Sequence, residues 1–353
     1  MIVRSLLIGL AAATYGASSA TTLESAFAPA LSESEWRVIA PGAETTCAFN
    51  TPFQFFFREG PNTKLLLVYF EGGGACWNWV SCSGMFDTSV SDSELEGFRG
   101  IFDFARPDNP FKDASVLFVP YCTGDVHIGD ATVRYGDPSW NPRPVEHRGW
   151  RNVSNVVRWA RQEVKAPERL IVSGASAGSY GALFHALTFS QLYPGAALTV
   201  IGDSGLPLLA NYGPVLDRWG ATNVIRADWG GTSEDPDTVT LLTAHERIAR
   251  LRPDAVIVHI TSQNDAVQRA FYIMSGSGEA KRVTFELLEA LQERIPQFRA
   301  FVIDGPDHGL MRTDKFYTYE VNGVGLTKWI ADLIRGTSVA SHYCEGCRIV
   351  PTM

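Results

Sequence analysis

Residues 174–178 read Gly-Ala-Ser-Ala-Gly, a Gly-x-Ser-x-Gly motif with Ser176 at its centre. An apolar run, residues 170–172, precedes the motif, and a helical stretch, residues 181–192, follows it. Between a strand and a helix this motif forms a sharp turn that lifts the serine hydroxyl above the sheet and leaves no space for side chains at its glycines. We therefore expect Ser176 to be a nucleophile. The alternative is a tight turn with an exposed serine.

A second glycine-rich segment, Glu-Gly-Gly-Gly-Ala-Cys at residues 71–76, follows the apolar residues 65–70. No lysine stands at the spacing of a phosphate-binding loop and no Gly-x-Gly-x-x-Gly is present, so nucleotide binding is disfavoured. A glycine run upstream of such a serine resembles the oxyanion loop of lipases and esterases. Its backbone N–H groups would join that of Ala177 around a developing oxyanion. The alternative is a flexible turn beside a disulfide.

The acid and the base that activate a serine are expected in loops that follow later strands. Asp265 follows the apolar run 256–260, and His308 follows the run 300–303. In α/β sheets the carboxyl ends of the strands gather the site residues at one edge. We expect His308 to take the proton of Ser176, and Asp265 to orient the His308 ring.

Other residues compete for both roles. Asp304 and Asp307 could replace Asp265 as the acid, but they stand four and one residues from His308 in a tight loop, where reaching Nδ1 is difficult. Three other late histidines are weaker candidates for the base, one in a helical pattern, one in a strand and one beside the last cysteines: His245, His259 and His342.

Two further patterns are set aside. Gly-Asp-Ser-Gly at residues 202–205 resembles the serine motif of trypsin-like proteases, but Leu206 follows it and no all-β pattern precedes it. We expect Asp203 to end a strand near the pocket. Three side chains have metal-ligand chemistry: Asp125, His127 and Asp130. Without His-Glu-x-x-His or a second cluster we favour structural or substrate-orienting roles for them and expect no metal.

These residues need elements that position them. Short, near-continuous apolar runs, typical of strands buried on both faces, recur at residues 65–70, 116–119, 170–172, 198–201, 256–260 and 300–303. Apolar residues at helical spacing mark residues 150–164 and 329–334, and Gly336 offers a helix stop. The alternation predicts an α/β fold, a mainly parallel sheet with helices on both faces. We expect one catalytic domain over residues 21–353, with lid insertions near 84–111 and 206–237.

Composition sets the limits of function. The chain has 353 residues, of which 45% are hydrophobic and 19% charged, which excludes a disordered or a polytopic membrane protein. The formal charge of −8 disfavours nucleic-acid binding.

Residues 1–20 combine Arg4, an apolar stretch and a small-residue end, so they are expected to be a signal peptide of a secreted or periplasmic protein. The alternative is a buried N-terminal helix. No later stretch has 18 uninterrupted apolar residues, so stable membrane insertion is not expected.

The chain has six cysteines, all after residue 20: Cys47, Cys76, Cys82, Cys122, Cys344 and Cys347. An even number in an exported chain indicates disulfides. The short spacings favour Cys76 with Cys82 and Cys344 with Cys347, which leaves the remaining two as a pair. The last pair could instead be a redox or zinc half-site.

Together these segments resemble the pectin acetylesterase family, which includes the Notum carboxylesterases. The resemblance spans roughly residues 45–335 and rests on motifs at residues 69–76, 120–125, 129–130, 174–178 and 264–268 and on the His308 loop. It implies an exported α/β-hydrolase without a cofactor. It also implies a triad and a set of oxyanion donors: Ser176, Asp265 and His308, with Gly73, Gly74 and Ala177.

The resulting hypothesis is a secreted serine carboxylic-ester hydrolase that removes acetyl groups from O-acetylated carbohydrate through an acyl-enzyme. One alternative is a lipid-type or polymer-ester hydrolase with a larger acyl pocket, and bulky aromatic residues in the segment 84–111 would argue against it. Another is an inactive carbohydrate-binding relative, which would not need Ser176, Asp265 and His308 together. Loss of residues 1–20 would bring the formal charge to −9, which disfavours polyanionic pectin as the substrate.

Overall fold

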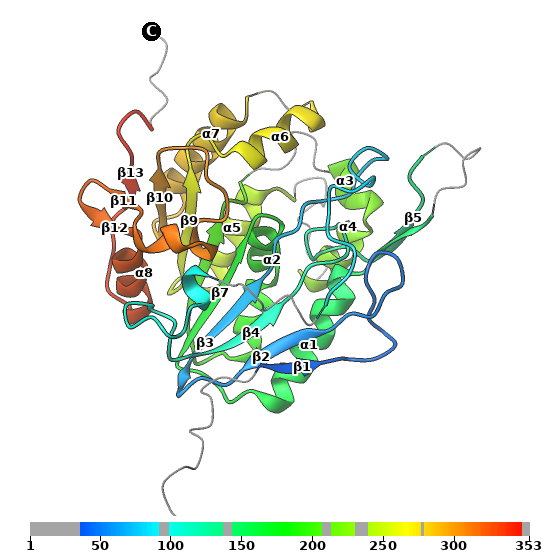
Figure 1. Ribbon diagram of the computed structural model, residues 1–353, viewed down its shortest axis with the longest axis horizontal. Helices are drawn as coiled ribbons and strands as arrows, with labels where there is room; N and C mark the ends of the chain where they lie inside the picture. Colours follow the sequence, from blue (N-terminus) through cyan, green and yellow to red (C-terminus); the bar gives the residue numbers. More distant parts are fainter. Residues whose placement is uncertain are drawn as a thin grey trace, which may run out of the picture. The chain divides into compact units, whose positions relative to one another are not determined.

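The computed structural model describes residues 36–91, 99–136, 143–206, 213–229, 239–276 and 279–347, which belong to one compact unit. A nine-stranded sheet crosses it in the order β1-β2-β4-β3-β7-β8-β9-β10-β13 (Figure 1). Its strands are β1 (Arg37–Ile39), β2 (Phe55–Arg58), β3 (Asn62–Phe70), β4 (Ala114–Val119), β7 (Arg169–Ala175), β8 (Ala197–Asp203), β9 (Val256–Ser262), β10 (Phe298–Ile303) and β13 (His342–Tyr343). The strands from β4 to β13 in this order run parallel to one another, while β2 runs antiparallel to both of its neighbours, β1 and β4. The expected α/β fold is confirmed.

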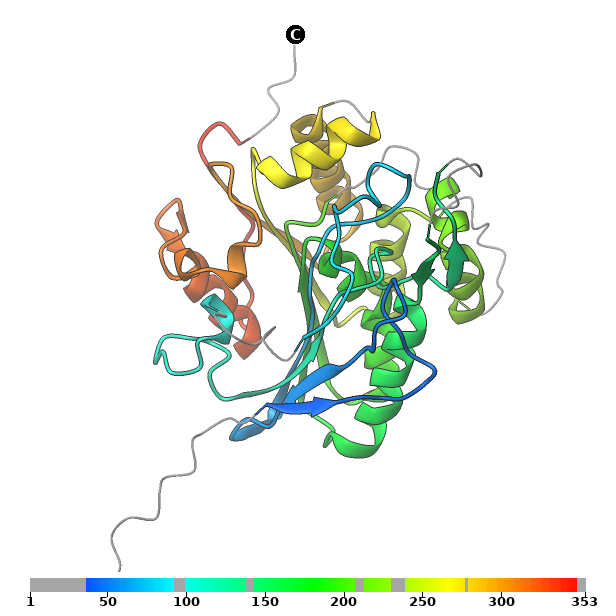
Figure 2. The same cartoon turned by 45° about the vertical axis from the view of Figure 1, so that its right-hand side comes forward.

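Helices cover both faces of the sheet. The helices are α1 (Gly149–Glu163), α2 (Ala177–Leu192), α3 (Gly213–Arg218), α4 (Ala221–Asp228), α5 (Leu241–Leu251), α6 (Ala266–Ser275), α7 (Ala280–Arg294) and α8 (Leu326–Arg335). Helices α1, α2, α5 and α7 pack on one face, and α8 packs on the other with short 3₁₀ turns (Figure 2). Helix α8 ends at Arg335 before Gly336, whose φ is 78°, as the glycine stop predicts.

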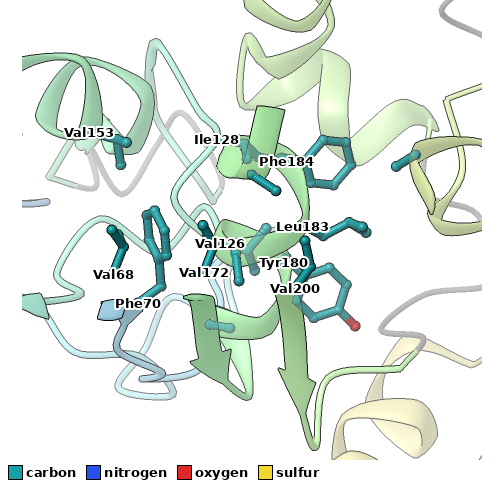
Figure 3. Close-up of a cluster of buried hydrophobic side chains, with 14 of the residues drawn as sticks. Val68, Phe70, Val126, Ile128, Val153, Val172, Tyr180, Leu183, Phe184 and Val200 are labelled. Atoms are coloured by element: carbon teal, nitrogen blue, oxygen red, sulfur yellow. The ribbon is translucent and has the colours of Figure 1, made fainter. Parts of the chain in front are cut away.

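Strand β3 shows why the apolar runs are continuous. Successive residues of a strand point to opposite faces. Val68 and Phe70 therefore lie in the core with α1 and α2, and Figure 3 shows them side by side in the cluster that includes Val126. Leu67 and Tyr69 lie in the second core, which includes α8. Both faces of the strand are buried, so no polar alternation appears in the sequence.

The strands that the sequence analysis did not find are short or at the edges. Strand β1 has three residues and β13 has two, shorter than the runs by which strands are recognised. Two small hairpins also escaped detection, β5 (Ala131–Val133) with β6 (Val145–His147), and β11 (Glu320–Val321) with β12 (Val324–Gly325). The six expected runs correspond to β3, β4, β7, β8, β9 and β10.

The segments expected as insertions are only partly described. Within residues 84–111, Ile101, Phe102 and Phe111 are buried in the core on the α8 side. Within residues 206–237, the structure describes α3 and α4. The expected signal peptide, residues 1–20, lies outside the described residues. No helix in the described ranges is long and apolar enough to cross a membrane.

Three disulfides join the six cysteines in the predicted pairs: Cys47–Cys122, Cys76–Cys82 and Cys344–Cys347. The first ties the segment before β2 to the residues just after β4. The second closes a loop that begins two residues after Gly74.

Candidate active site

Ser176 occupies the turn between β7 and α2 with φ 55° and ψ −123°. L-residues seldom adopt this conformation, and it persists only where the surroundings hold it. A Cβ at Gly174 would collide with the carbonyl oxygen of Gly178, and a Cβ at Gly178 would collide with that of Phe70. Both glycines of the motif are therefore needed for α2 to begin this close to β3. The Ser176 amide donates to the carbonyl oxygen of Asp203 at 2.8 Å.

Two of the expected oxyanion donors, Gly74 and Ala177, line the pocket beside Ser176. Gly74 has φ 80°, and a Cβ there would collide with the carbonyl oxygen of Met85. Ala177 is the first residue of α2, where amide groups lack partners within the helix. Among the described residues, no hydrogen-bond acceptor engages the N–H of Gly73, Gly74 or Ala177. Gly74 and Ala177 line the pocket. Gly73, the residue before Gly74, is not among the lining residues.

The structure brings Asp265 and His308 into direct contact. Nδ1 of His308 lies 2.7 Å from Oδ2 of Asp265. Asp265 also caps α6, because its Oδ1 accepts the amides of Val267 at 3.0 Å and Gln268 at 2.8 Å. The Asp265 carboxylate is thus buried and fixed, while the His308 side chain keeps 19% of its surface exposed. This arrangement orients the His308 ring and leaves its second nitrogen available.

His308 and Ser176 line the same pocket. The cavity has a volume of about 10 Å³, roughly the space that one water molecule requires. Its lining includes apolar and aromatic side chains, which form its apolar wall: Tyr180, Val267 and Phe271. Within the described residues no hydrogen bond joins the Ser176 hydroxyl to the His308 ring. In free enzymes this contact is often long and shortens when substrate binds.

The competing aspartates point elsewhere. Asp304 accepts a hydrogen bond from the Gly305 amide at 2.7 Å and another from the side chain of Gln263. Both carboxylate oxygens of Asp307 contact Nζ of Lys315 at 2.9 Å. The carboxylate that reaches His308 is therefore that of Asp265.

The other late histidines serve the core or lie at the edge. His245 donates from Nδ1 to the carbonyl oxygen of Leu241 at 2.6 Å, within α5. His259 is buried in β9, and burial lowers its pKa well below the usual value. His342 belongs to the short strand β13.

The three potential metal ligands have structural partners. Asp125 is fully buried and accepts hydrogen bonds from the amides of Gly129 at 3.1 Å and Gly149 at 2.8 Å. Burial raises the pKa of Asp125 to about 6. Asp130 forms an ion pair with Arg148 at 3.2 Å. No group of three or more His, Cys, Asp or Glu side chains in the described ranges is arranged to hold a metal ion.

His127 supports the glycine loop. Its Nε2 lies 2.8 Å from the carbonyl oxygen of Glu71, and burial lowers its pKa to about 3, so the ring is neutral and Nε2 is the donor. Glu71 directly precedes the three glycines. His127 thus holds the backbone where the loop begins, which favours the structural reading of this segment over the metal one.

Two side chains at the site were not singled out from the sequence. Gln268 lines the pocket and donates from Nε2 to Oδ2 of Asp265 at 3.0 Å. The pattern Asp-x-x-Gln at a helix start could have indicated it, since an acceptor at the N-cap is often paired with Gln three residues later. Arg312 forms an ion pair with the buried Glu71 at 3.2 Å, across 241 residues of sequence. No local signal points to that pair.

Comparison with known proteins shows relatives of this chain. A family profile described as Pectinacetylesterase matches residues 38–211. Palmitoleoyl-protein carboxylesterase NOTUM of Mus musculus is 25% identical over 173 residues, which cover 45% of this chain and 33% of the relative. The zebrafish relative, palmitoleoyl-protein carboxylesterase notum1a of Danio rerio, is 26% identical over 169 residues, 46% of this chain and 33% of the relative. Pectin acetylesterase 7 of Arabidopsis thaliana is 28% identical over 173 residues, 47% of this chain and 43% of the relative.

The matched regions thus span about a third of the length of the Notum relatives and less than half of the plant one. The matched region, residues 38–211, includes the glycine loop and the turn at Ser176. Over these residues, and in its parallel sheet and order of elements, the chain is similar to the pectinacetylesterase family.

Proposed function

We propose that the protein is a serine carboxylesterase whose catalytic residues are Ser176, His308 and Asp265. The observation that carries the proposal is the pocket itself, which is lined by Ser176 in a strained turn and by the ring that Asp265 holds. The amides of Gly74 and Ala177 lie at the same pocket. Nucleophile, base and anion donors at one place are what acyl transfer requires.

In this mechanism Oγ of Ser176 attacks the ester carbonyl while Nε2 of His308 takes its proton. Asp265 stabilises the imidazolium that forms. The N–H groups of Gly73, Gly74 and Ala177 hold the oxyanion of the tetrahedral intermediate. His308 then gives the proton to the leaving alkoxide, and an acyl-enzyme remains. A water molecule, deprotonated by His308, attacks the acyl carbon and releases the acid and free Ser176.

The substrate class that we favour is O-acetylated carbohydrate. The cavity beside Ser176 is small, about 10 Å³, which favours a short acyl group over a long one. The plant relatives carry the name pectin acetylesterase. The excess of acidic over basic residues, 38 against 30, favours a neutral polymer over a polyanionic one.

A lipid-type ester is the second candidate, because the matched Notum relatives are named palmitoleoyl-protein carboxylesterases. Its support in this chain is the apolar wall of the pocket, where Val267 is 39% exposed beside the buried Phe271. An acyl chain could extend along this wall.

We further propose that the protein works outside the cytoplasm. The expected signal peptide at residues 1–20 and three disulfides support export, since disulfides persist in oxidising compartments.

Hydrolysis of p-nitrophenyl esters from acetate to palmitate tests the activity and the acyl length together. We expect acetate to be fastest, and Ser176→Ala to lower kcat by at least about a thousandfold. Ser154→Ala is the matched control, because that serine lies on the exposed face of α1. Faster turnover of long chains would favour the lipid-type reading. If the wild-type protein hydrolyses none of the esters, the result would instead favour a binding protein.

A further inference from the structure

The Gly-Asp-Ser-Gly segment at residues 202–205 has no role in the mechanism above, yet it contacts both halves of the site. The carbonyl oxygen of Asp203 accepts the amide of Ser176 at 2.8 Å. The carboxylate of the same residue accepts the amides of Leu310 at 3.0 Å and Met311 at 2.8 Å. These two amides belong to the second and third residues after His308. Asp203 is fully buried, so its oxygens have no competing water.

Ser204 extends the same contact toward His308. Its Oγ accepts the amide of Gly309 at 3.0 Å and donates to Oδ1 of Asp203 at 2.8 Å. Its own amide donates to the carbonyl oxygen of Ile260 in β9 at 2.8 Å. Ser204 has φ 53° and lines the pocket. A non-glycine residue in this conformation is held there by its surroundings.

The two glycines allow α2 to lie directly on this segment. A Cβ at Gly205 would collide with the side chain of Ser179 and would lie 2.8 Å from the carbonyl oxygen of Ser176. A Cβ at Gly202 would lie 2.6 Å from Oγ of Ser179. Either substitution would push the first turn of α2 away, and Ser176 would move with it.

We propose that Asp203 and Ser204 are positioning residues that fix the His308 ring relative to the Ser176 hydroxyl. The proposal rests on the esterase function proposed above. Among the described residues, the hydrogen bonds that the two side chains accept from other segments come from residues 309–311, so they hold the loop that carries the proposed base. A shift of this loop by about 1 Å would cost roughly a hundredfold in rate.

Asp265 is one carboxylate beside His308, and Asp203 is a second one that interacts with it. The titratable and charged groups near it are Tyr69, Glu71, Arg312, Tyr319 and His308. Burial raises the pKa of Asp203, whereas the hydrogen bonds that it accepts and the nearby His308 lower it. Replacing the carboxylate by an amide removes its interaction with His308, in addition to loosening the loop.

The experiment compares Asp203→Asn with the wild type on p-nitrophenyl acetate and in labelling of Ser176 by a fluorophosphonate. Asn keeps one acceptor oxygen for the Leu310 amide, which limits the structural damage. We expect kcat to fall about a hundredfold while KM stays nearly constant. The acidic limb of the kcat/KM profile should move to lower pH, because the neighbouring negative charge is gone. Ser204→Ala removes the Gly309 contact and the hydrogen bond to Asp203 but leaves the Leu310 and Met311 contacts in place, and we expect about a tenfold loss of kcat.

Ile330→Val is the control for stability alone, since Ile330 is buried in α8 away from the pocket. It should lower Tm without a change in the pH profile. The proposal is overturned when folded Asp203→Asn retains wild-type kcat, or when it behaves as Ile330→Val does. Ser204→Ala decides the question where Asp203→Asn does not fold. If the probe does not label the wild type, the esterase function fails. If it labels wild type and Asp203→Asn equally fast, only the positioning role fails.

Discussion

Asp265 holds His308 with one carboxylate oxygen and caps helix α6 with the other. Oδ2 lies 2.7 Å from Nδ1 of His308, and Oδ1 accepts the amides of Val267 and Gln268. The helix start therefore fixes the acid, and the acid fixes the tautomer and the plane of the ring. A conservative replacement of Asp265 can therefore keep the α6 cap while it changes the contact with His308.

Asp265→Asn should preserve the fold and lower activity. The Asn side chain still offers an oxygen to the α6 amides, since Asn is as good an N-cap as Asp. It would favour the wrong tautomer of His308, so we expect kcat to fall by about 10³–10⁴-fold. Circular dichroism and p-nitrophenyl acetate hydrolysis measure the two effects. Activity within about tenfold of the wild type would assign the acid to another group.

Gly74→Ala should displace the N–H group that we propose as an oxyanion donor. A methyl group there would meet the carbonyl oxygen of Met85, and the backbone φ of 80° disfavours alanine. Loss of one such donor costs about 10²–10³ in kcat. KM should change little, because the donor acts on the charge of the transition state. Steady-state kinetics test this expectation.

The matched control is Gly84→Ala, in the same loop. Gly84 also has a positive φ, 119°, but a Cβ there meets no atom within 4 Å. Equal losses of kcat in the two variants would attribute the effect to loop strain in general rather than to the oxyanion site.

The residues at the site that could be predicted from the sequence each follow an apolar strand run. Asp265 and His308 follow β9 and β10, which are adjacent parallel strands. In a chain of alternating strands and helices, consecutive strands are usually neighbours in the sheet, so this pairing could be predicted. The contact of Arg312 with Glu71 and that of Asp203 with Met311 could not be predicted. They depend on the order of strands β3, β7, β8 and β9 across the sheet, and local sequence carries no information about that order. Short edge strands such as β1 could not be predicted for a different reason, because three residues are too few to show the alternation typical of a strand.

The disulfides should separate stability from activity. Cys47–Cys122 closes a span of 75 residues and Cys76–Cys82 one of 6 residues. The chain-entropy relation gives about 4 kcal/mol for the long span and about 2 kcal/mol for the short one. We expect the double variant Cys47→Ala/Cys122→Ala to lose more stability in urea unfolding. Cys76→Ser/Cys82→Ser should lose less stability but more kcat, because Cys76 follows the oxyanion glycines. The reverse order of kcat losses would contradict a role for this loop in the site.

Buried histidines should make the protein sensitive to acid. Burial lowers the pKa of His127 and His147 to about 3, and that of His185 and His245 to about 4. The folded state therefore binds fewer protons than the unfolded state below pH ~6.5, the usual histidine value. Their stabilising effect is complete above that pH and is lost as the pH falls toward 4. Burial also lowers the pKa of His259 well below the usual value. The raised pKa values of Asp125, Asp203 and Asp228 act in the opposite direction, but they are three groups against five.

His185→Gln isolates one of these histidines. Nε2 of His185 contacts the carbonyl oxygen of His127 at 2.8 Å, and an amide Nε2 can donate to the same oxygen without titrating. One histidine whose pKa is lowered to about 4 should cost on the order of 2 kcal/mol at pH ~4.5. Urea unfolding of wild type and variant at pH ~7.5 and ~4.5 measures the difference. We expect the variant to lose less stability between the two pH values, because it has one fewer group that takes up a proton on unfolding. Equal losses in both proteins would mean that His185 is protonated in the folded state, and that its contact with His127 does not depend on a neutral ring.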